Sequence, residues 1–128
     1  MIDITEEEFS IEDVVARAKR SEAGAVVSFL GTVRDDGILG MEVEAYRDVA
    51  VGELEKIRDE ATEMFGLLSV EVIHRVGPLS VGEGIVLIVC TAAHRQAAFR
   101  GCEYIIEGIK MRVPIWKKEI RAEGGRWV

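Results

Sequence analysis

The spacing of apolar and polar residues along the chain predicts three helices. The first begins after Ser10, a typical N-cap residue, and is expected to end near Glu22. The second covers residues 51–65 and stops at Gly66, because glycine readily takes the left-handed conformation that ends a helix. The third begins just after His94. Its apolar stripe consists of Ala98, Cys102, Ile105, Ile106 and Ile109.

Five strands are expected around these helices. β-Branched and small residues predict a strand over residues 25–33. Residues 41–46 alternate apolar with polar side chains, as a strand with one wet face does. Residues 70–76 form the next strand, and residues 85–93 are apolar throughout, which predicts a central strand covered on both faces. A short strand over residues 115–120 follows Pro114.

This order of elements predicts an α+β fold in one domain, residues 1–128. Short connections within each pair of strands favour antiparallel hairpins, so the helices are expected to pack on a largely antiparallel sheet. Two segments are expected to lack regular structure. One is the loop bracketed by Gly77-Pro78 and Gly82-Glu83-Gly84, and the other is the tail over residues 124–128.

The net charge of −7 is unevenly distributed. Residues 1–93 carry a net charge of −11, which argues against nucleic acid as a partner. Residues 94–128 carry a net charge of +4, which suggests either a local anion site or ordinary solvated charge. The longest apolar run, residues 85–90, is too short to span a bilayer, and the acidic start of the chain does not resemble a signal peptide. We therefore expect no membrane association and a cytoplasmic location.

Cys90 and Cys102 lie within apolar patterns and lack C-x-x-C spacing, so they are expected to be reduced core thiols. No spacing resembles a zinc, calcium, dinucleotide or P-loop motif, so no metal or cofactor is expected. The lone His74 is interpreted as a strand residue with satisfied hydrogen bonds.

The segment 110–119 is the richest in candidate chemistry, with four cations around Pro114. Proline ends the preceding helix, so Lys117 leaves in a different direction from Lys110. Partial burial and the neighbouring cations Arg112 and Lys118 would lower the pKa of these lysines from about 10.4 and free an amine. The alternative is a basic surface patch whose lysine stems lie on Trp116.

Three further residues are candidates for binding an anion. His94 and Arg95 open a helix, where free amide hydrogens and a partial positive charge attract anions. The alternative is that His94 caps the helix and Arg95 is solvated. Arg34 follows a strand, at a position where a charge is usually solvated.

Five segments together resemble the large, catalytic subunit of molybdopterin synthase, the MoaE family. They are Gly24–Arg34, Val72–Gly77, Ala93–Arg95, Lys110-x-Arg112-x-Pro114-x-Trp116-Lys117 and Gly125–Val128. The resemblance implies an α/β-hammerhead fold and a sulfurtransferase that converts cyclic pyranopterin monophosphate (precursor Z) to molybdopterin. Its sulfur would come from the C-terminal thiocarboxylate of a small ubiquitin-like subunit. Two large subunits would form a homodimer within a heterotetramer.

The resemblance also implies roles for individual residues. Lys110 and Lys117 match the catalytic lysines, with Lys110 nearest the incoming glycine tail, and Arg34, His94 and Arg95 match positions that bind the substrate phosphate. Because Arg126 follows Gly124-Gly125, this chain is expected to be the sulfur acceptor and not the carrier. Two other hypotheses are a non-enzymatic adaptor that docks a ubiquitin-like protein through its basic C-terminal third, and a thiol enzyme that uses Cys90 or Cys102.

Overall fold

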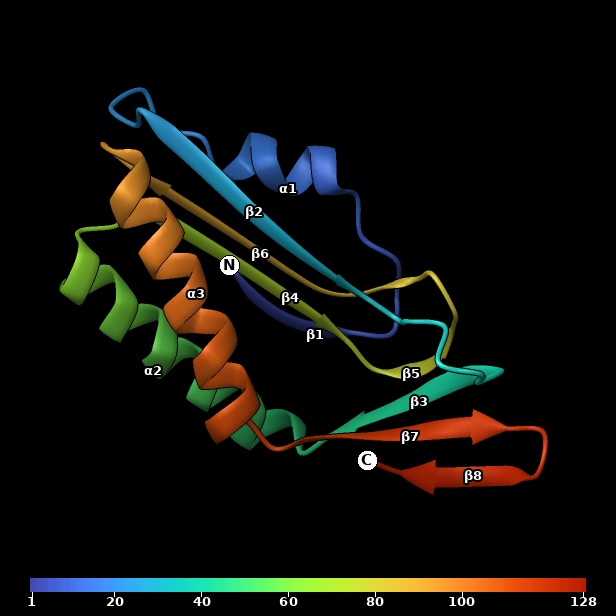
Figure 1. Cartoon of the computed structure of the whole chain (residues 1–128). Helices are drawn as coiled ribbons and strands as arrows, with labels where there is room; N and C mark the ends of the chain where they lie inside the picture. The colour runs from blue at the N-terminus through green and yellow to red at the C-terminus, as the bar shows by residue number, and fades with distance from the viewer.

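The computed structural model describes residues 1–128 and contains three helices and eight strands (Figure 1). In chain order the elements are β1 (Ile2–Thr5), α1 (Ile11–Ala18), β2 (Ala25–Thr32), β3 (Gly40–Ala45), α2 (Arg47–Phe65), β4 (Ser69–Arg75), β5 (Gly77–Ser80), β6 (Gly84–Ala92), α3 (Arg95–Arg112), β7 (Ile115–Arg121) and β8 (Gly124–Trp127).

The first sheet has the strand order β1-β4-β6-β2. β6 runs antiparallel to both β4 and β2, whereas β1 runs parallel to β4. Residues 85–92 of β6, all apolar except Thr91, are buried throughout, because helices α2 and α3 cover one face of the sheet and α1 covers the other (Figure 1). The prediction of a central strand covered on both faces is confirmed.

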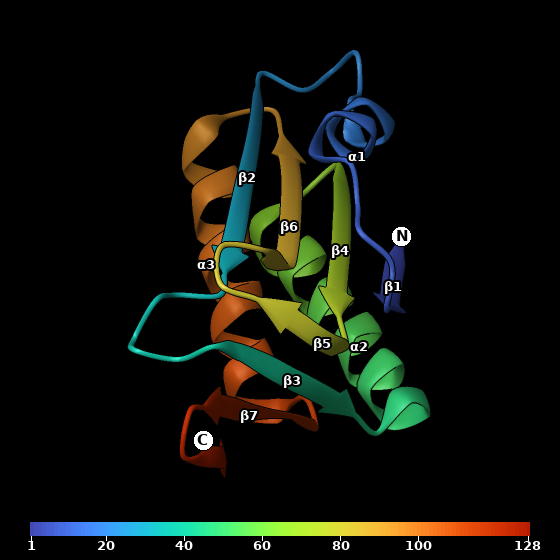
Figure 2. The ribbon, with the colours of Figure 1, turned by 90° about the vertical axis from the view of Figure 1, so that its right-hand side faces the viewer.

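The second sheet has the order β5-β3-β7-β8, and all its neighbouring strands are antiparallel. It lies below the first sheet, at the end where α3 stops (Figure 2). β7 starts directly after α3 and pairs with β3 along six residue pairs. This arrangement carries the chain from the end of a helix into the middle of a sheet within a few residues.

Short-range signals explain where the helices begin and end. The hydroxyl of Ser10 accepts a hydrogen bond from the amide of Asp13 at 3.2 Å and caps α1. Gly66 ends α2 in the left-handed conformation, with φ of 68°. Between the first sheet and the two long helices lies the main core, in which Leu54, Ile57 and Ile105 are almost completely buried. None of the helices is both long and apolar enough to cross a membrane.

The predicted α+β class is confirmed, but several details were wrong. β1 was not predicted, β5 lies in the expected loop, and β8 lies in the expected irregular tail. α1 ends at Ala18 and not near Glu22. β2 and β3 do not form a hairpin, because they belong to different sheets.

Candidate active site

Lys110 lies in the last turn of α3, which ends at Arg112. The next residue, Val113, has extended backbone angles (φ −91°, ψ 126°), because a residue before proline is disfavoured in the helical conformation. Pro114 also lacks the amide hydrogen that another helical turn would require. The chain therefore turns into β7 and leaves Lys110 exposed at the corner.

Lys117 lies on β7 and pairs with Val43 of β3. Directly paired residues of antiparallel strands point to the same face of a sheet, and Val43 is 1% exposed in the core. Lys117 therefore points towards the core and is half-buried, whereas Trp116 and Lys118 point to the other face. Burial lowers the pKa of Lys117, and the positive charge of Lys110 lowers it further. Lys110 therefore lies near enough to Lys117 for its charge to act on this ammonium.

A groove of about 490 Å³ lies between β2 and α3 and reaches Lys110. Phe29 of β2 and Ile106 of α3 are among the apolar side chains that line it, and Glu103 and Glu107 add two carboxylates. The sequence does not indicate that Phe29 and Ile106 line a groove, because apolar residues at such positions are typical of any packed strand and helix. The groove can hold a small organic molecule with one end against a cation.

The two other cations of the segment do not act on Lys117, contrary to the prediction. Arg112 turns away to α2, where its guanidinium binds Glu60 at 2.6 Å and Glu53 at 3.3 Å. The Lys118 ammonium lies over the ring of Trp127, 5.6 Å from the ring centroid. Arg112 therefore fixes the end of α3 against α2, and the low pKa of Lys117 arises from burial and from Lys110.

The predicted phosphate-binding residues lie at two different places. Arg34 is in the loop after β2, where its side chain is 83% exposed and binds Asp36 at 3.0 Å. His94 is the N-cap of α3 but makes no capping hydrogen bond with its side chain, and Arg95 is the first helical residue. Lys110 is in the last turn of the same helix, about 22 Å away at a rise of about 1.5 Å per residue. A single chain does not gather all these residues.

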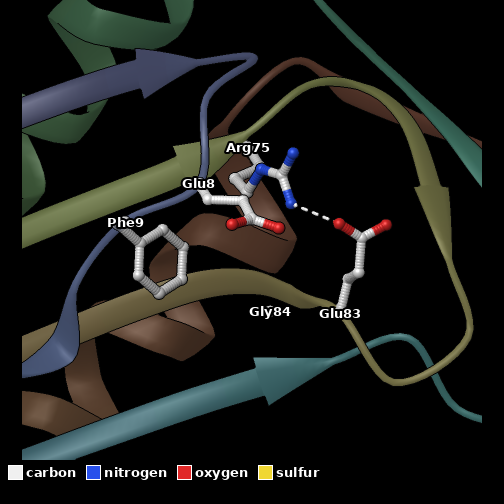
Figure 3. Close-up of a pocket in the computed structure, with 5 residues that line it drawn as sticks. All are labelled: Glu8, Phe9, Arg75, Glu83 and Gly84. Atoms are coloured by element: carbon white, nitrogen blue, oxygen red, sulfur yellow. Dashed lines mark hydrogen bonds and ion pairs between the residues drawn. The ribbon is translucent and has the colours of Figure 1, made fainter.

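A second pocket, of about 140 Å³, lies beside Arg75 and contains none of the predicted site residues (Figure 3). Arg75 is buried, and its guanidinium donates to the carboxylate of Glu83 at 3.0 Å and to the carbonyl of Glu6 at 2.9 Å. These bonds tie the end of β4 to the segment after β1 and to the turn before β6. Arg75, which belongs to the Val72–Gly77 segment, therefore has a structural role.

His74 is a residue of strand β4, as expected. It is buried, and its Nδ1 lies 2.9 Å from the carbonyl oxygen of Arg75. Burial lowers the pKa of His74 to about 4. The Arg75 carbonyl opposes this shift, and the positive charge of Lys117 adds to it. The sequence does not indicate that Lys117 lies near enough to His74 for its charge to act on the ring, because their strands belong to different sheets.

Both cysteines are free and buried, as predicted. A hydrogen bond with Cys102 and burial raise the pKa of the Cys90 thiol, which makes it a poor nucleophile. No group of side chains that could hold a metal ion is present. The groove itself is lined by the Lys110 amine, by the carboxylates of Glu103 and Glu107 and by the thiol of Cys102, whose pKa is lowered by its hydrogen bond with Cys90.

Residues 4–112 match the family model described as MoaE protein. The chain belongs to the MoaE family. Among its MoaE relatives, the molybdopterin synthase catalytic subunit of Pyrococcus abyssi is 42% identical over 127 residues, which are 95% of this chain and 85% of that protein. The catalytic subunit of Pseudomonas aeruginosa is 49% identical over 109 residues, which are 82% and 73% of the two chains.

Two solved structures have the same fold as this chain. Molybdopterin synthase from Staphylococcus aureus superposes with a TM-score of 0.92 at 39% identity, over 98% of this chain and 94% of that chain. A complex of subunits 1 and 2 of molybdopterin-converting factor from Helicobacter pylori contains a chain that superposes with a TM-score of 0.82 at 23% identity, over 99% and 89% of the two chains.

Proposed function

We propose that this chain is the catalytic subunit of a molybdopterin synthase and transfers sulfur to cyclic pyranopterin monophosphate. The observation that carries the proposal is that Lys110 lines the groove between β2 and α3 and lies near enough to the half-buried Lys117 for its charge to lower the pKa of that lysine. The relatives' name, molybdopterin synthase catalytic subunit, supports molybdopterin as the product. The whole chain, residues 1–128, acts as one domain in the cytoplasm, a location supported by its two free cysteines.

The sulfur donor is the C-terminal thiocarboxylate of a small ubiquitin-like subunit, whose glycine tail reaches the Lys110 end of the groove. The thiocarboxylate sulfur attacks a side-chain carbon of the pterin and displaces an oxygen substituent, which leaves with the electron pair of the broken carbon–oxygen bond. Water then cleaves the bond between the acyl group and sulfur. The sulfur stays on the pterin and the tail leaves as a carboxylate. Lys110 and Lys117 stabilise the negative charge that develops and move protons, so positioning and electrostatics dominate catalysis.

The substrate phosphate is bound by Arg34, His94 and Arg95, and we propose that two copies of the chain share this site. β2 is an unpaired edge strand of the first sheet, and α3 runs alongside it in the same direction. If β2 pairs antiparallel with β2 of a second copy, His94 and Arg95 of one copy approach Arg34 of the other. The exposed apolar residues Val26 and Leu30 of this strand support such a contact.

The experiment mixes the purified chain with thiocarboxylated small subunit and precursor Z and measures molybdopterin. Product formation supports the enzyme, whereas binding without product supports the adaptor hypothesis. A double Cys90→Ser, Cys102→Ser variant with full activity excludes the thiol enzyme. In a second arm, unfolded Lys117→Ala and Arg95→Ala chains are refolded together. If two copies share a site, each mixed dimer has one intact site, and roughly a quarter of wild-type activity returns.

A further inference from the structure

Arg112 connects the last turn of α3 to helix α2. Its guanidinium donates to both carboxylate oxygens of Glu60, at 2.6 Å and 3.1 Å, and to Glu53 at 3.3 Å. The hydroxyl of Tyr104, about two turns earlier in α3, donates to Glu60 at 2.6 Å. An exposed ion pair usually contributes little, but bidentate geometry and a second carboxylate make this cluster a network that can hold its members in place.

The two helices lie close together at this level. A Cβ at Gly108 of α3 would lie 3.1 Å from side-chain carbons of Ile57 on α2, so glycine permits the close approach. Gly108 lies about one turn before Arg112, and Ile57 lies about one turn from both Glu53 and Glu60. The ion pairs of Arg112 therefore belong to the face on which α2 and α3 pack.

The last turn of α3 has little backbone support of its own. Its final helical hydrogen bond runs from the amide of Val113 to the carbonyl of Ile109 at 3.2 Å. In a longer helix the carbonyl of Lys110 would accept from residue 114, but Pro114 has no amide hydrogen. Side chains must therefore hold this turn: Ile109 and Val113 through burial in the core, and Arg112 through its ion pairs.

Lys110 and Arg112 point to opposite sides of this turn. Residues two apart in a helix project about 160° from each other. Arg112 reaches α2, whereas Lys110 lines the groove between β2 and α3. The ion pairs thus leave the groove free and hold the backbone from which the Lys110 side chain extends.

We propose that Arg112 is a positioning residue: its ion pairs with Glu60 and Glu53 hold the last turn of α3 and so keep the Lys110 ammonium at the groove. The importance of this placement for sulfur transfer rests on the proposed function, whereas the placement itself does not. Arg112 acts only through Lys110.

Methionine at either end of the ion pair tests the role. Arg112→Met and Glu60→Met remove the bonds and keep an unbranched side chain that suits a helix. The measurement is the pKa of Lys117, taken from the pH dependence of its acetylation by acetic anhydride and located by mass spectrometry. The charge of Lys110 lowers this pKa. If the turn loosens and Lys110 moves away, the pKa should rise in both variants, towards its value in Lys110→Met.

The sign of the shift separates positioning from a direct effect of the charge removed. Arg112→Met removes a positive charge, which by itself would raise the pKa of a nearby lysine. Glu60→Met removes a negative charge, which by itself would lower that pKa. A rise of the Lys117 pKa in Glu60→Met therefore supports the proposal, and an unchanged or lower value overturns it.

Arg58→Met is the matched control, because Arg58 also lies on α2 but pairs with its sequence neighbour Asp59, at 2.9 Å. A rise in this variant equal to that in Glu60→Met would also overturn the proposal. Thermal melting checks that each variant folds, and Glu60→Gln replaces Glu60→Met if the latter does not fold.

Turnover provides a second measurement in the active enzyme. Arg112→Met and Glu60→Met should lower kcat about tenfold, with little change in KM for precursor Z, because a misplaced amine slows the reaction more than it weakens binding. Normal kcat in both variants would overturn a role in the reaction. The labelling needs no turnover, so it decides whether Arg112 positions Lys110 even if the wild type makes no molybdopterin.

Discussion

Lys110 and Lys117 lie on opposite sides of the break at Pro114, one on a helix and the other on a strand, and the charge of Lys110 lowers the pKa of Lys117. The fold produces this relationship because α3 cannot continue past Val113 and β7 enters the second sheet beside β3. Two ammonium groups that repel each other, one exposed and the other half-buried, are well suited to stabilise an anionic intermediate.

Removing either lysine should abolish most of the activity. We expect Lys110→Ala and Lys117→Ala to reduce molybdopterin formation by about 100-fold or more, because each removes a charge that stabilises the transition state. Both variants should still bind the small subunit in size-exclusion chromatography. Lys118→Ala is the matched control and should stay active, because this ammonium lies over Trp127 on the other face of β7. Near-normal turnover in both lysine variants would refute the assigned roles.

The charge of Lys110 should be visible in the titration of Lys117. A nearby positive charge disfavours a second one, so Lys110→Met should raise the pKa of Lys117 towards the ordinary lysine value. Competitive labelling of the amine across a range of pH measures this change. Burial remains in the variant, so the pKa should stay below that of an exposed lysine. An unchanged titration would mean that the two amines do not interact.

Two helical glycines should respond in opposite ways to alanine. A Cβ at Gly101 of α3 would lie 2.7 Å and 2.8 Å from the methyl carbons of Leu67, so Gly101→Ala should lower the free energy of unfolding by about 1–3 kcal/mol. A Cβ at Gly52 of α2 meets nothing within 4 Å, so Gly52→Ala should raise it by about 0.5–1 kcal/mol. Urea unfolding of both variants tests the packing of the two helices, and equal effects would contradict it.

His74 should make the stability of the fold depend on pH. Its pKa is lowered from 6.5 to about 4 on folding, so between these values the unfolded chain binds the proton more readily. The free energy of unfolding should therefore fall by up to about 3 kcal/mol as the pH falls from 6.5 to 4. Urea unfolding at several pH values should show a smaller fall in His74→Gln, whereas the exposed His94→Gln should behave like the wild type. Identical curves for all three proteins would exclude this contribution.

The parts of the fold that depend on neighbouring residues could be predicted from the sequence. The cap at Ser10, the stop at Gly66 and the break at Pro114 are local, and all three are found where expected. β1 could not be predicted in the same way, because this short strand forms only by pairing with β4, far along the chain. β8 likewise depends on its hairpin with β7. The Gly124-Gly125 pair is typical of irregular segments, so no strand was predicted there.

The candidate site, too, could be predicted only where it depends on residues close together in the sequence. The position of the lysines around a proline break was evident from spacing, and the match to the MoaE family confirms the resemblance that singled them out. The orientation of Arg112 was not evident, because Glu53 and Glu60 lie on another helix. The predicted third helix placed Arg95 and Lys110 at opposite ends, and the continuous helix α3 confirms this.

The most direct test is a crystal structure of the chain with the small subunit and precursor Z bound. The account predicts that the reacting carbons of the pterin side chain lie against the ammonium groups of both Lys110 and Lys117. It also predicts that the phosphate contacts Arg34 of one copy and His94 and Arg95 of a second copy. A substrate bound elsewhere, with the two ammonium groups pointing into solvent away from it, would contradict the account.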